Sequence, residues 1–202
     1  MKFHNTIIYL IGIPAVGKYT TAREIGRLTG ARVVDNQLIN NPVFSVIGYD
    51  GTDAFPFPRE AWAQIEKIRT AVLNVIRDLS PPDTSFVFTN VLNAKDAGDR
   101  ALFRRIERLA KQRGAGFFPV WLTCEAAELR RRKNTPERKA RFKDTDLTNI
   151  PRWVHEFEVY KVEHPNALTL DTTYSEPRRT ARRILEHVRK AVRAGRTATP
   201  TS

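Results

Sequence analysis

The sequence contains a single cysteine, Cys124, among its 202 residues. One cysteine excludes an internal disulfide framework and any metal site built from a cluster of cysteines. No apolar run approaches the roughly 20 residues that a membrane-spanning helix requires. Close after Lys2 come polar His4, Asn5 and Thr6, so the N-terminal residues do not have the arrangement of a signal peptide. These absences lead us to expect a cytoplasmic protein.

Acidic residues are scarce in the second half of the chain. Lys and Arg number 34 against 22 Asp and Glu, which gives a net charge of +12. Residues 101–202 hold 23 of these basic residues but only 12 of the acidic ones. A basic half suits an anionic ligand such as ATP, a phosphorylated substrate or nucleic acid. A set of solvated, arginine-rich helix faces would explain the same excess.

Short apolar runs alternate with segments of helical periodicity, a pattern that predicts a parallel sheet covered by helices on both faces. The length fits one domain, which we place at residues 1–194, with a disordered tail at 195–202. The segment 40–59 contains two glycines and three prolines and is predicted to be irregular. Strands are expected at residues 6–11, 31–35, 85–89, 117–123 and 167–170. Helices are expected at residues 18–29, 60–79, 96–113, 125–133, 151–162 and 176–194.

The spacing G-x-x-x-x-G-K follows the first predicted strand and opens the first predicted helix. Glycines at both ends allow a tight turn whose backbone N–H groups surround phosphate oxygens, and the helix adds the positive end of its dipole. The lysine then reaches the β- and γ-phosphates. We therefore predict an ATP site made by Gly12, Ile13, Pro14, Ala15, Val16, Gly17, Lys18, Tyr19 and Thr20.

Tyr19 stands where many such loops have the Ser or Thr that ligates Mg²⁺. The arrangement Gly-x-Pro-x-x-Gly-Lys-x-Thr resembles the loop of adenylate kinases. The resemblance implies that Thr20 contacts the α-phosphate and that Mg²⁺ is held mainly through water, since Mg²⁺ usually keeps several waters. Thr20 and Asp35 are the candidate protein ligands of the metal.

The order of strands, loop and charged segment resembles the small P-loop kinases: adenylate, shikimate and gluconate kinases, chloramphenicol phosphotransferase and zeta-toxin-like ATP-binding proteins. The resemblance implies an α/β fold of the three-layer P-loop NTPase type, with a five-stranded parallel sheet, helices on both faces and a small lid. It places the lid at about residues 130–146. It also implies ATP and Mg²⁺ as cofactors.

Three residues are candidates for binding the phosphate acceptor. Asp35 ends the second predicted strand, where a carboxylate can take the proton of an acceptor hydroxyl; capping of the following turn is the alternative. Asn90 ends the third strand, where many P-loop proteins have an aspartate, and it contacts either substrate or loop backbone. Arg69 lies within a predicted helix from which related kinases bind substrate, although a surface position is an equal alternative. Thr172, after the last strand, is a candidate nucleotide contact by the same resemblance.

The segment 130–143 is dominated by basic residues. Arginines on a closing lid neutralise the charge that develops on the transferring phosphate and exclude water. Arg131 or Arg132 is a candidate lid cation, with Arg132 as the predicted nucleotide contact. Arg138 and Arg141 are candidate catalytic residues expected to share one helical face. A solvated run of charge is the alternative for any single arginine.

These features together predict an ATP-dependent phosphotransferase that acts on a hydroxyl of a small molecule. Lys18 and Asp35, with Arg138 and Arg141, are the predicted catalytic residues, and Asp35, Arg69 and Asn90 the acceptor-binding ones. One alternative is a kinase of nucleic-acid ends, which the basic second half suggests. Another is a nucleotide-dependent binding or regulatory protein with little turnover, which the altered metal positions 19 and 90 suggest.

Overall fold

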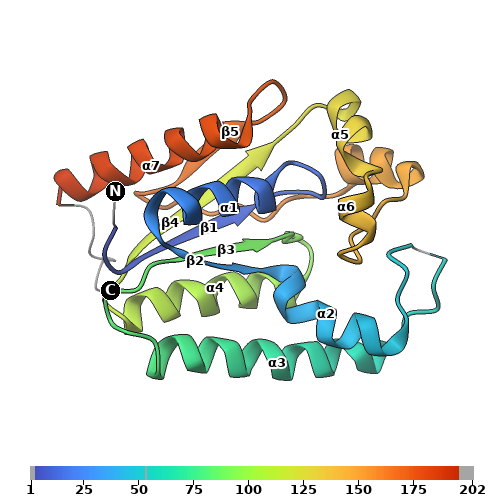
Figure 1. Ribbon diagram of the computed structural model, residues 1–202, viewed down its shortest axis with the longest axis horizontal. Helices are drawn as coiled ribbons and strands as arrows, with labels where there is room; N and C mark the ends of the chain where they lie inside the picture. Colours follow the sequence, from blue (N-terminus) through green and yellow to red (C-terminus); the bar gives the residue numbers. More distant parts are fainter. Residues whose placement is uncertain (1–2, 53, 196–202) are drawn as a thin grey trace.

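The computed structural model describes residues 3–52 and 54–195. Its centre is one sheet of five parallel strands in the order β2-β3-β1-β4-β5 (Figure 1). The predicted α/β fold with a five-stranded parallel sheet is therefore confirmed. The strands are β1 Thr6–Ile11, β2 Arg32–Asp35, β3 Phe86–Asn90, β4 Gly116–Thr123 and β5 Leu168–Asp171.

Strand β1 occupies the middle of the sheet because all six of its residues are apolar or β-branched and buried. It pairs with β3 on one side and with β4 on the other. The register sets Ile11 opposite both Asn90 and Trp121, and Asp35 opposite Thr89. The carboxyl ends of β1, β2 and β3 therefore meet at one edge, where open parallel sheets bind their ligands.

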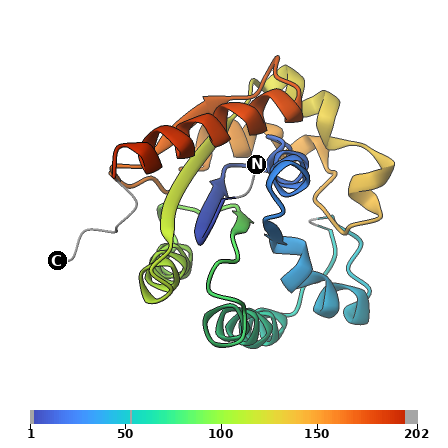
Figure 2. The ribbon, with the colours of Figure 1, turned by 60° about the vertical axis from the view of Figure 1, so that its left-hand side comes forward.

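Helices cover both faces of the sheet (Figure 2). Helices α1 (Lys18–Thr29) and α7 (Pro177–Arg193) pack together on one face, and α3 (Arg59–Asp78) and α4 (Ala97–Gln112) lie on the other. The core is correspondingly divided into two apolar clusters, one on each side of the sheet. The alternation of side chains along β1 feeds both clusters.

Helix α2 (Asn36–Ile47) covers residues 40–47 of the segment 40–59 that was predicted to be irregular, so the prediction was wrong there, whereas the described residues from 48 to 58 form no helix or strand. The carboxylate of Asp35 caps its first turn by accepting a hydrogen bond from Leu38 N at 3.3 Å. Gly48 ends it in a left-handed conformation. Both terminal signals outweigh Pro42 inside the helix, which removes one backbone hydrogen bond.

The helix predicted at residues 151–162 was also wrong. Only a short π-helical turn, η2 (Arg152–Glu156), forms there, and the chain then runs extended. Tyr160 N donates to Leu92 O at 2.9 Å, and Trp121 Nε1 donates to Tyr160 O at 2.8 Å. The segment thus satisfies its backbone against the ends of β3 and β4 instead of within a helix.

The other predicted helices are present with ends that agree with the prediction or differ from it by one residue. Helix α3 turns Trp62, Val75 and Leu79 toward solvent, although their spacing fitted its apolar series. Residues 196–202 of the predicted tail lie outside the described residues. Among the described residues, the model has no helix long and apolar enough to cross a membrane. The remaining short elements are α5 Ala126–Lys133, α6 Pro136–Lys139 and η1 Leu147–Asn149.

Candidate active site

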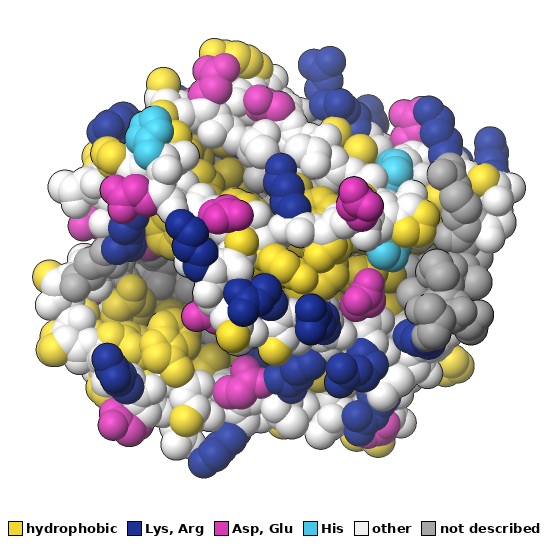
Figure 3. Space-filling model, turned by 180° about the vertical axis from the view of Figure 1, so that it is seen from behind, with side chains coloured by type: hydrophobic (Ala, Val, Ile, Leu, Met, Phe, Trp, Pro, Cys, Tyr) yellow, Lys and Arg dark blue, Asp and Glu magenta, His cyan; other side chains and the backbone are white. Residues whose placement is uncertain are grey.

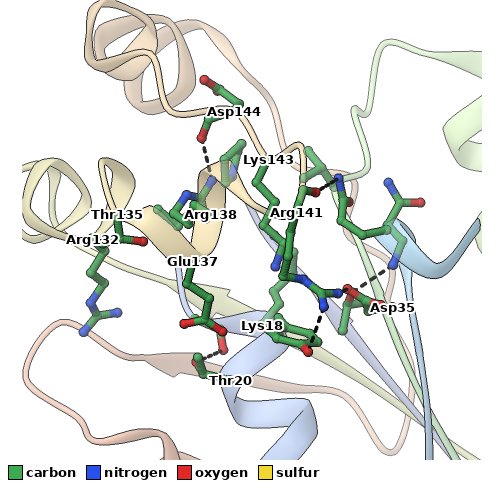
Figure 4. Close-up of a pocket in the computed structure, with 18 of the residues that line it drawn as sticks. Lys18, Thr20, Asp35, Arg132, Thr135, Glu137, Arg138, Arg141, Lys143 and Asp144 are labelled. Carbon is green, nitrogen blue, oxygen red and sulfur yellow. Dashed lines mark hydrogen bonds and ion pairs between the residues drawn. The ribbon is translucent and has the colours of Figure 1, made fainter. Parts of the chain in front are cut away.

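A cavity of about 360 Å³ lies at the carboxyl edge of the sheet. Its floor is the loop between β1 and α1, one wall is the start of α2, and the roof is the segment that contains α5 and α6 (Figure 4). We call residues 130–146 the lid segment. Most of the predicted site residues line this one cavity: Pro14, Ala15, Gly17, Lys18, Tyr19, Thr20, Asp35, Asn90, Arg132, Arg138 and Arg141.

The loop at residues 12–17 has the backbone that phosphate binding requires. A Cβ at Gly12 would lie 2.5 Å from the carbonyl oxygen of Leu122, so only glycine allows this approach to β4. Gly17 has φ 90°, in the left-handed region, and Ala15 adopts φ 69° despite its side chain. The loop is thus held in a fixed, partly strained conformation, as is common at functional sites.

Lys18 closes this loop from inside. Its ammonium group donates to Gly12 O at 2.6 Å and to Ile13 O at 2.8 Å. Desolvation, and then the positive charges of Arg138 and Lys143, hold the pKa of Lys18 well below its usual value. Three cations that repel one another around a cavity form a site that an anion would stabilise.

Thr172 contacts the backbone of the loop, and Arg132 in turn binds the segment that contains Thr172. The Thr172 hydroxyl lies 2.9 Å from Val16 O, and the side chain is buried. The Arg132 guanidinium donates to Thr172 O at 2.7 Å and to Thr173 O at 3.1 Å, and it is anchored by Glu128 at 2.7 Å. Arg132 therefore joins the lid segment to the loop after β5.

Asp35 lines the cavity at the start of α2. Its Oδ2 is 2.8 Å from Arg141 Nη2, and its Oδ1 caps α2. Arg141 also donates to the Tyr19 hydroxyl at 3.0 Å. The two roles that we left open for Asp35, cap and site carboxylate, are thus compatible in one side chain.

The basic side chains of the lid segment do not all come from one helix, contrary to what had been predicted. Helix α6 has only four residues, and Arg141 lies beyond its end, so the expected common helical face is wrong. The chain instead turns through Phe142, whose φ of 51° is left-handed. Arg138 donates to Asp144 O at 2.7 Å. Arg138, Arg141 and Lys143 nevertheless all extend from the lid segment toward the cavity (Figure 4).

A chain of hydrogen bonds determines which side-chain atoms the cavity wall beside Asp35 presents. Arg69, which is buried and paired with Glu66, can only donate, so its contact at 3.4 Å identifies the Asn36 side-chain oxygen. Asn90 Nδ2 donates to the same oxygen at 2.8 Å, and Tyr9 donates to Asn90 Oδ1 at 3.1 Å. The Asn36 amino group is therefore left as a donor at the cavity wall.

Sequence reasoning did not select several residues of the cavity, among them Asn36, Gln37, Glu137 and Lys143. Asn36 and Gln37 directly follow Asp35, so proximity to a site residue was the available signal. Gln37 Nε2 lies 3.4 Å from Phe142 O and so links α2 to the lid segment. Lys143 and Glu137 belong to the charged run, in which no pattern distinguished inward from outward side chains.

The donors around the loop fit a magnesium ion that is held chiefly through water. Among the residues that the structure describes, no group of three His, Cys, Asp or Glu side chains is placed to hold a metal. Thr20 donates its hydroxyl to Gly17 O at 3.0 Å, and Glu137 extends from α6 toward Thr20 (Figure 4). Thr20 and Glu137 provide the hydroxyl and carboxylate oxygens that suit Mg²⁺ at this place.

Lys143 is expected to make ATP binding depend on pH. Desolvation and then the charge of Arg141 lower the pKa of Lys143 to about 8. Below pH 8 Lys143 is a cation and attracts polyphosphate; above it the ammonium loses its proton. We expect the Kd for ATP, measured by calorimetry, to rise about tenfold from pH 7 to pH 9.

The matched variant for this prediction is Lys143→Met, which has no charge to lose. Its Kd at pH 7 should approach that of the unaltered protein at pH 9, and its dependence on pH should be weaker than that of the unaltered protein. An equal pH dependence in both proteins would show that another group titrates.

Comparison with solved structures identifies the fold. A gluconokinase from Sinorhizobium meliloti 1021 is 13% identical with TM-score 0.59 and covers 96% of this chain and 97% of its own. A thymidylate kinase from Candida albicans is 13% identical with TM-score 0.59, and the match covers 94% of this chain and 93% of the kinase. An APS kinase from Mycobacterium tuberculosis is 16% identical with TM-score 0.55, and the match covers 93% of this chain and 99% of the kinase. No protein-family model and no curated protein matches the sequence. The chain therefore has the fold of the small P-loop kinases.

Proposed function

On the premise of this fold, we propose that the protein is an ATP-dependent phosphotransferase that moves the γ-phosphate to a hydroxyl group of a small molecule. The observation that supports it is the cavity, which Lys18, other residues of the loop and Asp35 line together. Arg138 and Lys143 extend from the lid segment toward it, and Arg141 lies beside Asp35 (Figure 4). A phosphotransferase needs such groups around one space, because nucleotide, transferring phosphate and acceptor must meet there.

The chain's own groups account for the steps of such a transfer. The acceptor oxygen attacks the γ-phosphorus, the bond to the oxygen of ADP breaks, and the hydroxyl proton passes to Asp35. Lys18 and Arg138 stabilise the charge on the phosphate oxygens. Bound Mg²⁺ would neutralise the β- and γ-phosphates. Closure of the lid segment excludes water from the cavity.

The acceptor end favours recognition of uncharged oxygen groups. Arg69 is already paired with Glu66, and Arg141 with Asp35, so neither cation is free to attract a carboxylate. The Asn36 amino group is a donor at this place, and each Asp35 oxygen already accepts one hydrogen bond, from Arg141 or from Leu38 N, but keeps a further lone pair. Such a pair suits adjacent hydroxyl groups on one small molecule.

A nucleic-acid end is the second candidate acceptor. Dark-blue Lys and Arg side chains lie across the face opposite to that of Figure 1, with magenta acidic side chains between them (Figure 3). This mixed arrangement agrees better with solvated charge than with one basic groove. Oligonucleotides nevertheless belong in the test, because the second half of the chain holds 23 of the 34 basic residues.

The experiment is an ATP-consumption assay of the whole chain with Mg²⁺ and a panel of acceptors. The panel compares neutral polyols and sugars, their carboxylated counterparts, nucleosides and oligonucleotides. We expect turnover with a neutral hydroxyl compound. ATP binding without turnover on any member would contradict the kinase proposal and favour a nucleotide-dependent binding protein.

A further inference from the structure

We propose that Tyr19 is a positioning residue that holds the lid cations of this site over the transferring phosphate. This inference rests on the proposed phosphotransfer, but it concerns a contact that can be measured without it. In many P-loops the residue after the lysine faces a metal ion. Here it faces the lid.

Tyr19 contacts two lid cations at once. The Arg141 guanidinium carbon lies 3.9 Å from the centre of the Tyr19 ring, and the Lys143 ammonium lies 4.2 Å from it. Both distances are well inside the range of cation–π attraction. The Tyr19 hydroxyl adds a hydrogen bond of 3.0 Å from Arg141 Nη1. One side chain on α1 therefore binds two residues that the sequence places more than 120 positions later.

The contact determines where Arg141 points. Its Nη2 is left to reach Asp35 at 2.8 Å, while Nη1 is held by Tyr19. Arg141 thus stands between the acceptor carboxylate and the cations at the phosphate end (Figure 4). Because Tyr19 directly follows Lys18, the first turn of α1 positions both the phosphate-binding lysine and the ring that contacts Arg141.

The effect of Tyr19 should be exerted through Arg141. Tyr19→Leu removes both ring and hydroxyl, and we expect kcat/KM for the acceptor to fall about 10- to 100-fold. The Kd for ATP should change less than about threefold, because the loop amides and Lys18 remain. Tyr19→Phe keeps the ring and should lose only about three- to tenfold.

A double-mutant cycle separates this role from a general structural one. The loss in the double variant Tyr19→Leu, Arg141→Gln should be much smaller than the product of the two single losses, because only Lys143 is then left for Tyr19 to position. Arg23 also faces the Tyr19 ring, at 5.8 Å and from an exposed position, so Arg23→Gln is the matched control that should change neither constant. Losses that simply multiply in the double variant would overturn the proposal.

Backbone hydrogen exchange of residues 134–146 provides a readout without any acceptor. In Tyr19→Leu the backbone amides of this segment should exchange about tenfold faster, whereas the exchange rates of β1 and β4 should stay unchanged. If the unaltered protein phosphorylates nothing, the proposed function fails while this result still tests the contact. Unchanged exchange would overturn the inference. A Tyr19→Ser variant with higher turnover and tighter Mg²⁺ dependence would also overturn it, because position 19 would then be an impaired metal ligand.

Discussion

Replacing Lys18 by methionine is expected to lower kcat by about 10²- to 10³-fold, the usual cost of removing a donor that stabilises transition-state charge. The Kd for ATP should rise as well, because the hydrogen bonds to Gly12 O and Ile13 O place the Lys18 cation within the loop that is proposed to bind phosphate. The measurements are turnover with the best acceptor and ATP binding by calorimetry.

The stability of the empty protein should respond differently from its activity. The pKa of Lys18 is held low by desolvation and by Arg138 and Lys143, so its charge is unfavourable when no phosphate is bound. Lys18→Met removes this repulsion at the cost of two hydrogen bonds. We expect the unfolding midpoint to shift by only a few degrees. A large drop in midpoint would mean that Lys18 supports the fold rather than the phosphate.

Asp35→Asn is expected to reduce kcat by about 10²- to 10⁴-fold, the range for removal of a general base. The amide keeps the size and the oxygen that caps α2 through Leu38 N, so the local fold should persist. It removes the negative charge that attracts Arg141. ATP binding should remain close to normal, because Asp35 lies at the acceptor end.

Asp35→Ala serves as the comparison, since it removes the cap as well as the charge. We expect a further loss of about 1 kcal/mol in the free energy of unfolding, measured with urea. If Asp35→Asn retains full turnover, Asp35 acts only as a helix cap, which is the alternative that the sequence left open.

The parts of this structure that the sequence predicted are those with local causes. The buried run of β1, the two glycines of the P-loop and Lys18 lie within a dozen residues of one another. Their conformations follow from turn geometry and burial at that point in the chain. The strands of the sheet could be predicted equally well, because they are short apolar runs between segments of helical periodicity.

The parts that sequence reasoning missed depend on contacts between distant segments. Arg141 meets Asp35 across 106 positions, and Asn90 meets Asn36 across 54. No spacing along the chain predicts these pairs. The helix expected at 151–162 failed for the same reason, since Tyr160 bonds to Leu92 and Trp121 rather than to its own turn.

One feature of the lid segment would make its proposed closure observable by fluorescence. The indole of Trp153 donates to Asp144 at 3.1 Å, and Asp144 also pairs with the buried Lys133 at 2.8 Å. Its backbone oxygen accepts from Arg138, one of the cations that nucleotide would attract. A shift of Arg138 is thus transmitted to a fluorophore. With Trp62 replaced by Phe, the emission of Trp153 over the constant background of buried Trp121 would follow closure in real time.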